Sequence, residues 1–458
     1  MDLFYRLKKS YISPTRAIGL SFLAVIIIGS ILLSLPICHT KDIPYLDHLF
    51  TATSATCVTG LVSVVVKDEY TFLGQIVIII LIQIGGLGFL TLLSMFLVKF
   101  KKRLSYKNKL IMQEALNQNS VKEIGVFIQR VIRYTLFFES VGAILLAFVF
   151  IPQYGFTTGI YYAIFHSISA FCNAGFDILG SNSLIDYQTS PLMNLTISSL
   201  IIAGGLGFIV WIELKDKFYQ VLKKKLKLKK LFETLSLHAK IVLSMTFMLL
   251  MSGTIFFLLL EYDHTLASLS FFDKLQVSYF QSVTLRTAGF ASVDMSSLKD
   301  ATKLFMSIFM FIGGSPAGTA GGIKTVTFAL ILLSCSSLAQ GKNEITAFKR
   351  TISSVVVKRA LVISFISLSM TLFASIVLSI SENQSFINIV FEVYSAFATV
   401  GLTAGLTPLL TNIGKIVIII LMYIGRIGPL TMVLIFVKKH NQLKGKEIEY
   451  PKGDILIG

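Results

Sequence analysis

Long apolar runs, separated by short polar segments, dominate the chain. Five of them carry no Asp, Glu, Lys or Arg over 20 residues or more, namely residues 17–40, 70–98, 187–212, 241–260 and 360–381. About 20 apolar residues cross the roughly 30 Å hydrocarbon core of a bilayer as an α-helix. A transmembrane β-barrel would need alternating apolar and polar positions, which runs such as residues 76–82 lack. The pattern predicts an all-α integral membrane protein.

A short motif recurs four times. In each copy a Phe precedes a glycine by nine or ten residues, small or hydroxyl residues lie between them, and Leu or Phe follows. The glycines are Gly60, Gly175, Gly289 and Gly401, separated by 115, 114 and 112 residues. A second mark follows each glycine 24 to 29 residues later, at Gly85-Gly86, Gly204-Gly205, Gly313-Gly314 and Gly425-Arg426. Two marks in register indicate a fourfold internal repeat.

Each repeat predicts a long apolar helix, a short half-helix, an irregular glycine segment and a second long helix. A half-helix of roughly a dozen residues is about 18 Å long, so it enters the membrane without crossing it. In the first repeat, Asp47 and Asp68 flank the motif, and the chain must return to the side from which it came. We therefore expect eight transmembrane helices and four re-entrant loops, arranged as four helix–pore-loop–helix repeats around a pseudo-fourfold pore.

These patterns divide the chain into nine segments. We expect a cytoplasmic N-terminus (1–16), repeat 1 (17–98), a cytoplasmic linker (99–127), repeat 2 (128–219), a basic cytoplasmic linker (220–237), repeat 3 (238–340), a cytoplasmic linker (341–354), repeat 4 (355–437) and a C-terminal tail (438–458).

The glycine segments predict an ion pathway. Irregular backbone at membrane depth is tolerated only where it is buried in protein or lines a watery path. Four such loops on one axis would present carbonyl oxygens that replace the hydration shell of a cation, with the negative ends of the half-helix dipoles facing the ion. The predicted selectivity filter consists of Val58, Thr59, Gly60, Asn173, Ala174, Gly175, Thr287, Ala288, Gly289, Thr399, Val400 and Gly401.

The second helix of repeat 3 cannot be continuous. From residue 303 to residue 340 it would measure about 57 Å, nearly twice the thickness of the membrane core. Five glycines and a proline interrupt it, and they break a helix decisively. We expect residues 313–325 to form an intramembrane gate loop beneath the filter. The predicted gate residues are Gly313, Gly314, Ser315, Pro316, Ala317, Gly318, Thr319, Ala320, Gly321, Gly322 and Arg426.

Two arginines stand out among apolar neighbours. Arg426 lies in an otherwise apolar helix, where an unpaired charge is costly, so we expect it to point into the cavity beneath the filter and contact the gate loop. The alternative is that it snorkels to the inner membrane interface. Arg286 directly precedes the third filter segment, and we expect it to brace that segment from behind, with Glu392 and Asp294 as candidate partners.

Three further polar side chains lie in or beside the apolar segments. Lys415, at the outer end of the last helix, is either a residue that tunes the entrance or an ordinary interfacial lysine. His166 is expected to be hydrogen-bonded within its half-helix rather than to bind a metal, because no second ligand is suitably spaced. Glu139 is expected to be capped by a neighbouring group.

The charge distribution gives the orientation. The net charge is +17, and 32 of the 41 Lys and Arg residues fall in the predicted inner segments, against 10 acidic residues there. This positive-inside asymmetry places both termini in the cytoplasm. The basic run at residues 223–230 therefore indicates a juxtamembrane loop rather than a nucleic-acid site. Four cysteines without CxxC spacing predict neither a disulfide framework nor a zinc site.

One segment carries a more specific signal. Thr399-Val400-Gly401 repeats the TVG core of potassium-channel filters, whereas the other three repeats keep only the glycine. With four modules on one chain, the sequence resembles the Trk/Ktr/HKT superfamily of potassium transporters, and most closely the membrane subunit of bacterial Ktr systems (KtrB/KtrD). Further stretches that carry this resemblance are residues 83–89, 113–118, 172–176, 286–290, 424–430 and 450–458.

The resemblance implies a function and an assembly. It implies potassium uptake across the bacterial plasma membrane by a channel-like subunit that is not an enzyme, with K⁺ as the transported ion and Na⁺ as an activator. It also implies a homodimer in membrane lipid, seated on a cytosolic KtrA/KtrC-like RCK ring that binds the regulatory nucleotide. In this family the equivalent of Arg426 contacts the gate loop. No nucleic acid is expected as a partner.

Two other functions compete with this one. A sodium- or proton-coupled secondary transporter would use discontinuous helices at the midplane, usually in inverted repeats. An even number of spans per module makes these repeats parallel, which favours a channel-like axis but leaves coupling open. An intramembrane hydrolase is disfavoured, because Ala317 replaces the last glycine of GxSxG after Ser315 and no base lies at similar depth.

Overall fold

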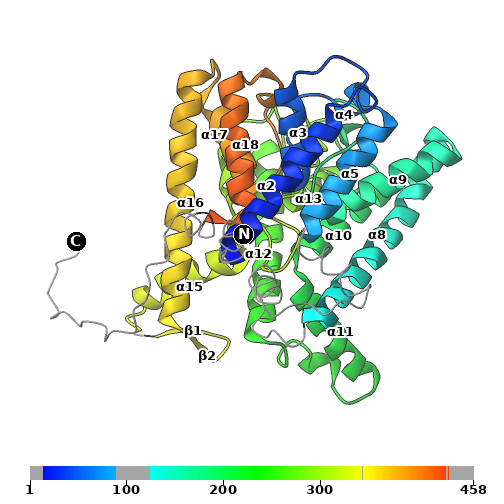
Figure 1. Ribbon diagram of the computed structural model, residues 1–458. Helices are drawn as coiled ribbons and strands as arrows, with labels where there is room; N and C mark the ends of the chain where they lie inside the picture. The colour runs from blue at the N-terminus through cyan, green and yellow to red at the C-terminus, as the bar shows by residue number, and fades with distance from the viewer. Residues whose placement is uncertain (1–13, 89–123, 343, 430–431, 433–458) are drawn as a thin grey trace, which may run out of the picture.

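The computed structural model describes residues 14–88, 124–342, 344–429 and 432 (Figure 1). Most of the predicted N-terminal segment, most of the linker 99–127 and the tail 438–458 lie outside the described residues. So do the stretches 113–118 and 450–458 of the family resemblance.

Four groups of helices follow one another along the chain, and we call them modules 1 to 4. Each module contains a first helix, a short helix that ends just before its glycine, and a second helix. Module 1 contains α2 (Pro14–Leu33), α3 (Tyr45–Cys57), α4 (Val66–Glu69) and α5 (Phe72–Leu87). Module 2 contains α8 (Ile124–Tyr154), α9 (Phe156–Phe171), η1 (Ile185–Tyr187), α10 (Pro191–Gly205), α11 (Phe208–Leu222) and η2 (Leu228–Lys230). Module 3 contains α12 (Leu237–Glu261), α13 (Phe271–Thr284), α14 (Asp300–Phe311) and α15 (Thr325–Ala339). Module 4 contains α16 (Ser354–Ser381), α17 (Phe386–Ala398), η3 (Thr407–Leu409) and α18 (Asn412–Ile427).

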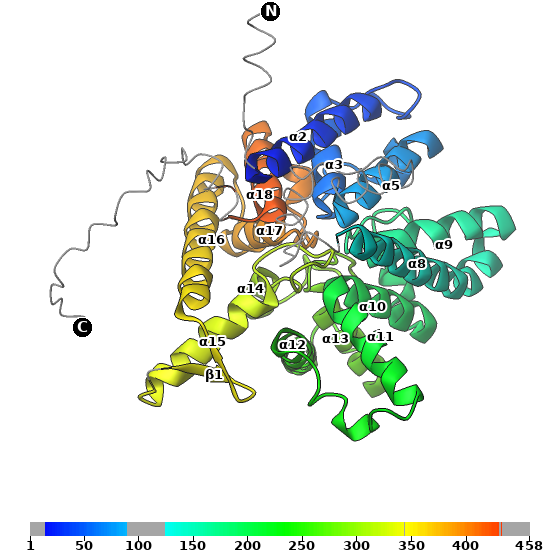
Figure 2. The ribbon, with the colours of Figure 1, turned by 60° about the horizontal axis from the view of Figure 1, so that its bottom comes forward.

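The modules surround a common centre in chain order (Figure 2). A hydrophobic core fills each boundary between neighbouring modules. Modules 1 and 2 share a core that contains Tyr70 and Phe165, and modules 2 and 3 share one that contains Phe171 and Phe280. The other two boundaries are filled around Phe257 and Phe391, and around Phe50 and Phe397. Because the last of these joins module 4 to module 1, the circle is closed.

The first helix of each module is long and apolar enough to cross a membrane. The qualifying ranges are Arg16–Leu33, Gly125–Tyr154, Leu237–Glu261 and Ser354–Ser381. Within the described residues, the second helices are shorter or interrupted. The protein is thus a helical, multi-pass membrane protein, and the count of eight spans stays a prediction.

Module 2 departs from the predicted pattern. The apolar run at 187–212 suggested one continuous second helix, but α10 and α11 meet at a bend of 100°. Gly207 adopts a positive φ of 87° at the bend, and the Phe208 amide donates a hydrogen bond to the Ala317 carbonyl (2.9 Å). The break is therefore stabilised by a segment more than a hundred residues away.

Between modules 3 and 4 lies a two-stranded hairpin, β1 (Ile345–Ala347) and β2 (Arg350–Ile352), which the all-α prediction did not include. Its two-residue turn, Phe348 and Lys349, has positive φ at both positions, as a tight hairpin turn requires. The hairpin lies beside α15 and away from the centre of the fold (Figure 2).

Candidate functional site: a ring of glycine segments

Four three-residue segments, the glycine segments, follow the short helices α3, α9, α13 and α17. In each, the first and third residues have left-handed backbone, which is rare for side-chain-bearing residues. The φ values at the first positions are 57° at Val58, 58° at Asn173, 64° at Thr287 and 55° at Thr399. At the third positions they are 96° at Gly60, 68° at Gly175, 79° at Gly289 and 99° at Gly401. The four segments therefore share one irregular backbone conformation.

The four glycines form a closed ring. A Cβ atom added at Gly60 would lie 3.1 Å from the Cα of Gly175, and one at Gly175 would lie 2.8 Å from the Cα of Gly289. A Cβ added at Gly289 would lie 3.1 Å from the Cα of Gly401, and one added at Gly401 would lie 2.9 Å from the Cα of Gly60. Each added atom would also meet a backbone carbonyl oxygen of the next segment. Only glycine fits this crowded, left-handed position.

The second glycine mark has a packing role in three modules. A Cβ at Gly85 would collide with the carbonyl oxygen of Thr56, one at Gly204 with that of Phe171, and one at Gly425 with that of Phe397. Each of these carbonyls belongs to one of the last two residues of the short helix in the same module. In module 3 the equivalent Gly313 faces Gly321 and the Thr287 side chain instead. The glycines let the second helices press against the ends of the short helices.

Hydroxyl side chains brace the glycine segments in two different ways. In modules 1 and 4, the amides of Gly60 and Gly401 donate to Ser54 Oγ and Ser395 Oγ (both 3.1 Å). In modules 2 and 3, Ser169 Oγ and Thr284 Oγ1 donate instead to the carbonyls of Phe176 (2.7 Å) and Phe290 (2.8 Å). The residue after the glycine follows the same division, because it is Leu in modules 1 and 4 and Phe in modules 2 and 3.

Three threonine hydroxyls of the glycine segments are buried without a hydrogen-bond partner among the described residues. They are the Oγ1 atoms of Thr59, Thr287 and Thr399. An unpaired buried hydroxyl is costly unless a water or an ion satisfies it. Since these oxygens lie beside a ring crowded with backbone carbonyls, the site offers oxygen ligands, which suit a hard cation.

A vestibule of about 540 Å³ opens on one face of the ring, and we call this face outer. All four ring glycines line it, together with the acidic residues Glu69, Asp177 and Asp294. No Lys or Arg appears among the described lining residues. Lys41 pairs with Glu69 (2.8 Å) outside the lining. A cavity lined by one sign of charge concentrates ions of the opposite sign.

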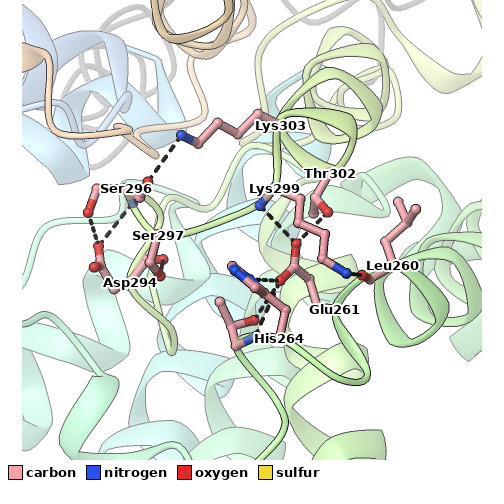
Figure 3. Close-up of polar contacts among 10 residues, drawn as sticks. Leu260, Glu261, His264, Asp294, Ser296, Ser297, Lys299, Thr302 and Lys303 are labelled. Carbon is pink, nitrogen blue, oxygen red and sulfur yellow. Dashed lines mark hydrogen bonds and ion pairs between the residues drawn. The ribbon is translucent and has the colours of Figure 1, made fainter.

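Buried carboxylates hold the outer loops of modules 3 and 4. Glu261 accepts hydrogen bonds from the Lys299 amide (3.1 Å), Thr302 Oγ1 (2.5 Å) and His264 Nδ1 (3.0 Å), as Figure 3 shows. It thereby ties the end of α12 to the start of α14. Glu382 does the same in module 4, where it accepts from the Thr411 amide (3.1 Å) and Thr411 Oγ1 (2.6 Å). A carboxylate at a helix N-terminus is also favoured by the helix dipole.

The opposite, inner face of the ring is covered by residues 313–325, which we call the inner loop. A Cβ at Gly321 would collide with the Thr399 hydroxyl, and one at Gly313 would lie 3.2 Å from Thr287 Cγ2. Thr319 Oγ1 donates to the carbonyl of Phe171 (3.1 Å) and to Asn173 Oδ1 (2.9 Å). The loop therefore touches the first residue of three glycine segments.

Two cations donate hydrogen bonds to carbonyls of the inner loop, Arg426 from α18 and Lys324 from the loop itself. The guanidinium of Arg426 donates to the carbonyls of Thr319 in the loop and of Gly85 and Gly86 at the end of α5. Lys324 Nζ donates to the carbonyl of Ala320 (2.6 Å). Both side chains are half-buried. The sequence prediction named Arg426 as a gate residue and placed Lys324 inside the gate loop 313–325 without naming it individually.

Arg286 is placed behind the third glycine segment, but neither candidate partner contacts it. Its three guanidinium nitrogens are buried without a hydrogen-bond partner in the part of the chain that the structure describes. Glu392 accepts instead from Thr403 (2.9 Å) and Thr407, and Asp294 from Ser296 (2.7 Å). Both carboxylates are thus satisfied within their own loops. The Arg286 carbonyl accepts a hydrogen bond from Asn173 Nδ2 (3.2 Å), and its role as a brace stays a prediction.

The remaining polar side chains have identifiable neighbours. Lys415 forms an ion pair with Asp47 (2.5 Å) at the outer end of α18. His166 Nδ1 lies 2.7 Å from the Tyr162 carbonyl in its own helix, as expected. Glu139 accepts from Gln83 Nε2 (3.4 Å) across the boundary between modules 1 and 2. Within the described residues, no group of three or more His, Cys, Asp or Glu side chains could hold a metal ion.

Comparison with known proteins assigns the chain to a family. Residues 12–448 match the family TrkH, described as cation transport protein. The chain belongs to the TrkH family of cation transport proteins. This TrkH-family chain is 42% identical to the Ktr system potassium uptake protein B of Bacillus subtilis (strain 168), over 97% of each chain. It is also 40% identical to the potassium/sodium uptake protein NtpJ of Enterococcus hirae, over the whole of both chains.

The fold agrees with this assignment. The crystal structure of the potassium transporter TrkH from Vibrio parahaemolyticus superposes with a TM-score of 0.74 at 17% identity, covering 94% of this chain and 86% of that one. At that identity the likeness concerns the fold. The family match and the relatives confirm the resemblance drawn from the sequence, and they place the chain in a family of transporters rather than of enzymes.

Proposed function

We propose that this protein conducts potassium ions through the glycine ring and is the membrane subunit of a bacterial potassium uptake system. The closed ring of Gly60, Gly175, Gly289 and Gly401 carries the proposal. Carbonyl oxygens arranged around an axis replace the water shell of an alkali cation. The printed names of the relatives, which are potassium or potassium/sodium uptake proteins, support potassium as the ion.

In this proposal the glycine segments are the selectivity filter, and the inner loop with Arg426 is the gate. The loop lies against the inner end of three glycine segments, where it blocks the path of an ion. Arg426 binds the Thr319 carbonyl and so holds the loop in that place. The four modules would supply eight spans and four re-entrant segments, with both termini in the cytoplasm.

The protein is further proposed to be a homodimer that works with a cytosolic RCK ring, which binds the regulatory nucleotide. Three relatives are named as parts of a Ktr system, and a named system implies a second component. Sodium would act as an activator. A sodium- or proton-coupled transporter is the second candidate, favoured by the potassium/sodium name of the Enterococcus hirae relative.

Ion flux from proteoliposomes tests the proposal. Gly401→Ser places a side chain where it would meet Thr59 O and Gly60, so we expect the potassium-to-sodium permeability ratio to fall roughly 10-fold. Gly405→Ser is the matched control, because Gly405 also has positive φ (88°) but has only a contact at 3.8 Å. An unaltered ratio in Gly401→Ser would remove the filter assignment. A reversal potential that follows the potassium gradient indicates a channel, whereas a fixed offset set by sodium or protons indicates coupling.

A further inference from the structure

A groove of about 980 Å³ lies between α8 and α11, away from the glycine ring. Its apolar wall contains Phe137 and Phe138 from α8 and Trp211 and Phe218 from α11. Phe138 and Trp211 lie against each other, with ring centroids 4.9 Å apart. Phe137 and Phe218 are 60% and 53% exposed. The wall is therefore an aromatic surface that the protein leaves largely uncovered.

The groove is also basic. Arg130, Arg133 and Lys215 line it, and Asp216 is the single acid among its described lining residues. Arg130 lies 3.9 Å from Asp216, but both side chains are exposed, and such a pair contributes little. Lys215 Nζ lies 5.6 Å from the centroid of the Tyr134 ring. Three cations against one carboxylate leave the groove with an excess of positive charge.

The course of α11 places the groove near one membrane surface. The 100° bend turns α11 away from the direction of α10, so α11 does not continue the line of that helix. Exposed Phe218, Tyr219 and Leu222 lie on α11, and the basic residues 223–230 follow directly. Apolar and aromatic residues beside a basic run are typical of a helix in the headgroup region of the inner leaflet.

We propose that this groove binds one anionic phospholipid of the inner leaflet. The phosphate would lie on Arg130, Arg133 and Lys215, and an acyl chain would cover Phe137, Phe138 and Trp211. Guanidinium groups bind phosphate oxygens through paired, charge-assisted hydrogen bonds. Basic pockets between helices on the cytoplasmic side suit anionic headgroups, whereas a zwitterionic headgroup offers no net charge to these cations.

The bound lipid would also act on the inner loop, and this part rests on the proposed function. The Phe208 amide at the start of α11 is bonded to Ala317 of the loop (2.9 Å). On the other wall, Phe138 stacks on Phe171 at 5.7 Å, and the Phe171 carbonyl accepts from Thr319 of the loop. A lipid that holds α8 and α11 together therefore favours one position of the loop.

Trp211 provides a direct probe, because it is the single tryptophan of the chain. The full-length protein is reconstituted in phosphatidylcholine vesicles that contain an equal mole fraction of either brominated phosphatidylglycerol or brominated phosphatidylcholine. Bromine in the acyl chain quenches tryptophan fluorescence on contact. We expect stronger quenching by phosphatidylglycerol, and roughly a 10-fold loss of its relative association constant in the triple variant Arg130→Gln, Arg133→Gln and Lys215→Gln.

The matched control removes three cations outside the groove, through Lys225→Gln, Lys227→Gln and Lys229→Gln, and should keep the preference. Equal quenching by both lipids, or a preference that survives in the triple groove variant, overturns the proposal. A preference lost equally in the control variant indicates diffuse surface attraction and also overturns it. So does full competition by millimolar inorganic phosphate, which would indicate a site for a soluble anion.

A second measurement distinguishes a failure of the lipid-site proposal from a failure of the proposed potassium pathway. Potassium flux is measured in vesicles with and without phosphatidylglycerol, in the wild type and in the triple groove variant. We expect flux to depend on phosphatidylglycerol only in the wild type. Headgroup-selective quenching without any potassium flux would support the lipid site and count against the potassium pathway.

Discussion

The two faces of the glycine ring differ in charge and in what covers them. The outer face opens into a vestibule lined by Glu69, Asp177 and Asp294 and by no Lys or Arg among the described residues. The inner face is covered by residues 313–325, with Arg426 and Lys324 bonded to carbonyls of that loop. The charges around the outer face therefore favour a cation, whereas the two cations at the inner face do not. Under the proposed function, this difference would place the barrier to conduction on the inner side.

The two faces are also held by different means. At the outer face, the carboxylates of Glu261, Glu382 and Glu392 each accept at least two hydrogen bonds from groups that they tie together. At the inner face, the loop is bonded through its backbone to Gly204, Gly205 and Phe208, and through the Thr319 hydroxyl to Phe171 and Asn173. Buried carboxylates therefore hold the outer face, whereas backbone groups and one hydroxyl hold the inner loop.

Removing the inner loop should uncover the inner face of the ring, so that both faces are open. Deletion of residues 314–321 takes away the segment beneath Thr287 and Thr399, so we expect potassium flux from proteoliposomes to rise on the order of 100-fold. The potassium-to-sodium permeability ratio should stay near that of the wild type, because the glycine ring is left intact. Unchanged or lower flux would mean that the loop is no barrier.

Neutralising one cation at the inner face of the ring should raise potassium flux by a smaller factor than deleting the loop. Arg426→Gln removes both the charge and the bond to Thr319, and we expect flux to rise roughly 10-fold. Lys415→Gln is the matched control on the same helix, since it removes a charge at the outer end, where Lys415 pairs with Asp47. It should not raise flux. If both variants raised flux equally, the charge asymmetry between the faces would have no effect on conduction.

The ring glycines, the break in the second helix of repeat 3 and the place of Arg426 could be predicted from the sequence, because each depends on the residue types in a short stretch of chain. The ring glycines recur at nearly equal spacing, and five glycines with a proline in an apolar run break a helix in any context. The place of Arg426 beside the loop followed from the cost of an unpaired charge among apolar residues. These features depend on residue type more than on distant partners.

The features that sequence reasoning missed depend on tertiary contacts. The bend before α11 uses one glycine and a hydrogen bond to Ala317, and no local pattern distinguishes Gly207 from its neighbours. The sequence did not single out Glu261 and Glu382, because their donors are 38 and 29 residues away. For the same reason, sequence could not show that Arg286 has no pairing carboxylate among the residues that the structure describes.

Loosening the outer face should cost stability. In Glu261→Gln the amide group cannot accept from all of Lys299, Thr302 and His264, so we expect the free energy of unfolding to fall by about 1–3 kcal/mol. Thermal unfolding in detergent measures it. Asp263→Asn is the control two residues away, because Asp263 is exposed and its change should stay within about 0.5 kcal/mol. Equal stability of both variants would refute the bracing role.

The smallest expected effect concerns the charge of the vestibule. Burial raises the pKa of Asp177 to about 6, although hydrogen bonds from its own loop, including one from the Leu179 amide, oppose the shift. The carboxylate is therefore negative above about pH 6 and becomes neutral below it. Because the vestibule then attracts cations less strongly, we expect inward potassium flux to fall about 2-fold when the outer pH drops from about 7.5 to about 5.

Asp177→Asn tests this assignment against a second vestibule acid. The variant should show the low flux at both pH values, whereas Asp294→Asn should keep the pH dependence of the wild type. Raising the salt concentration should reduce the effect of Asp177 on ions in the open vestibule, because salt screens electrostatic attraction beyond about 10 Å at 0.1 M ionic strength. A pH response that persists in Asp177→Asn would assign the titration to another group. In that case the charge of Asp177 would not control the attraction of cations to the outer face. The difference in charge between the two faces would then not depend on the protonation of Asp177.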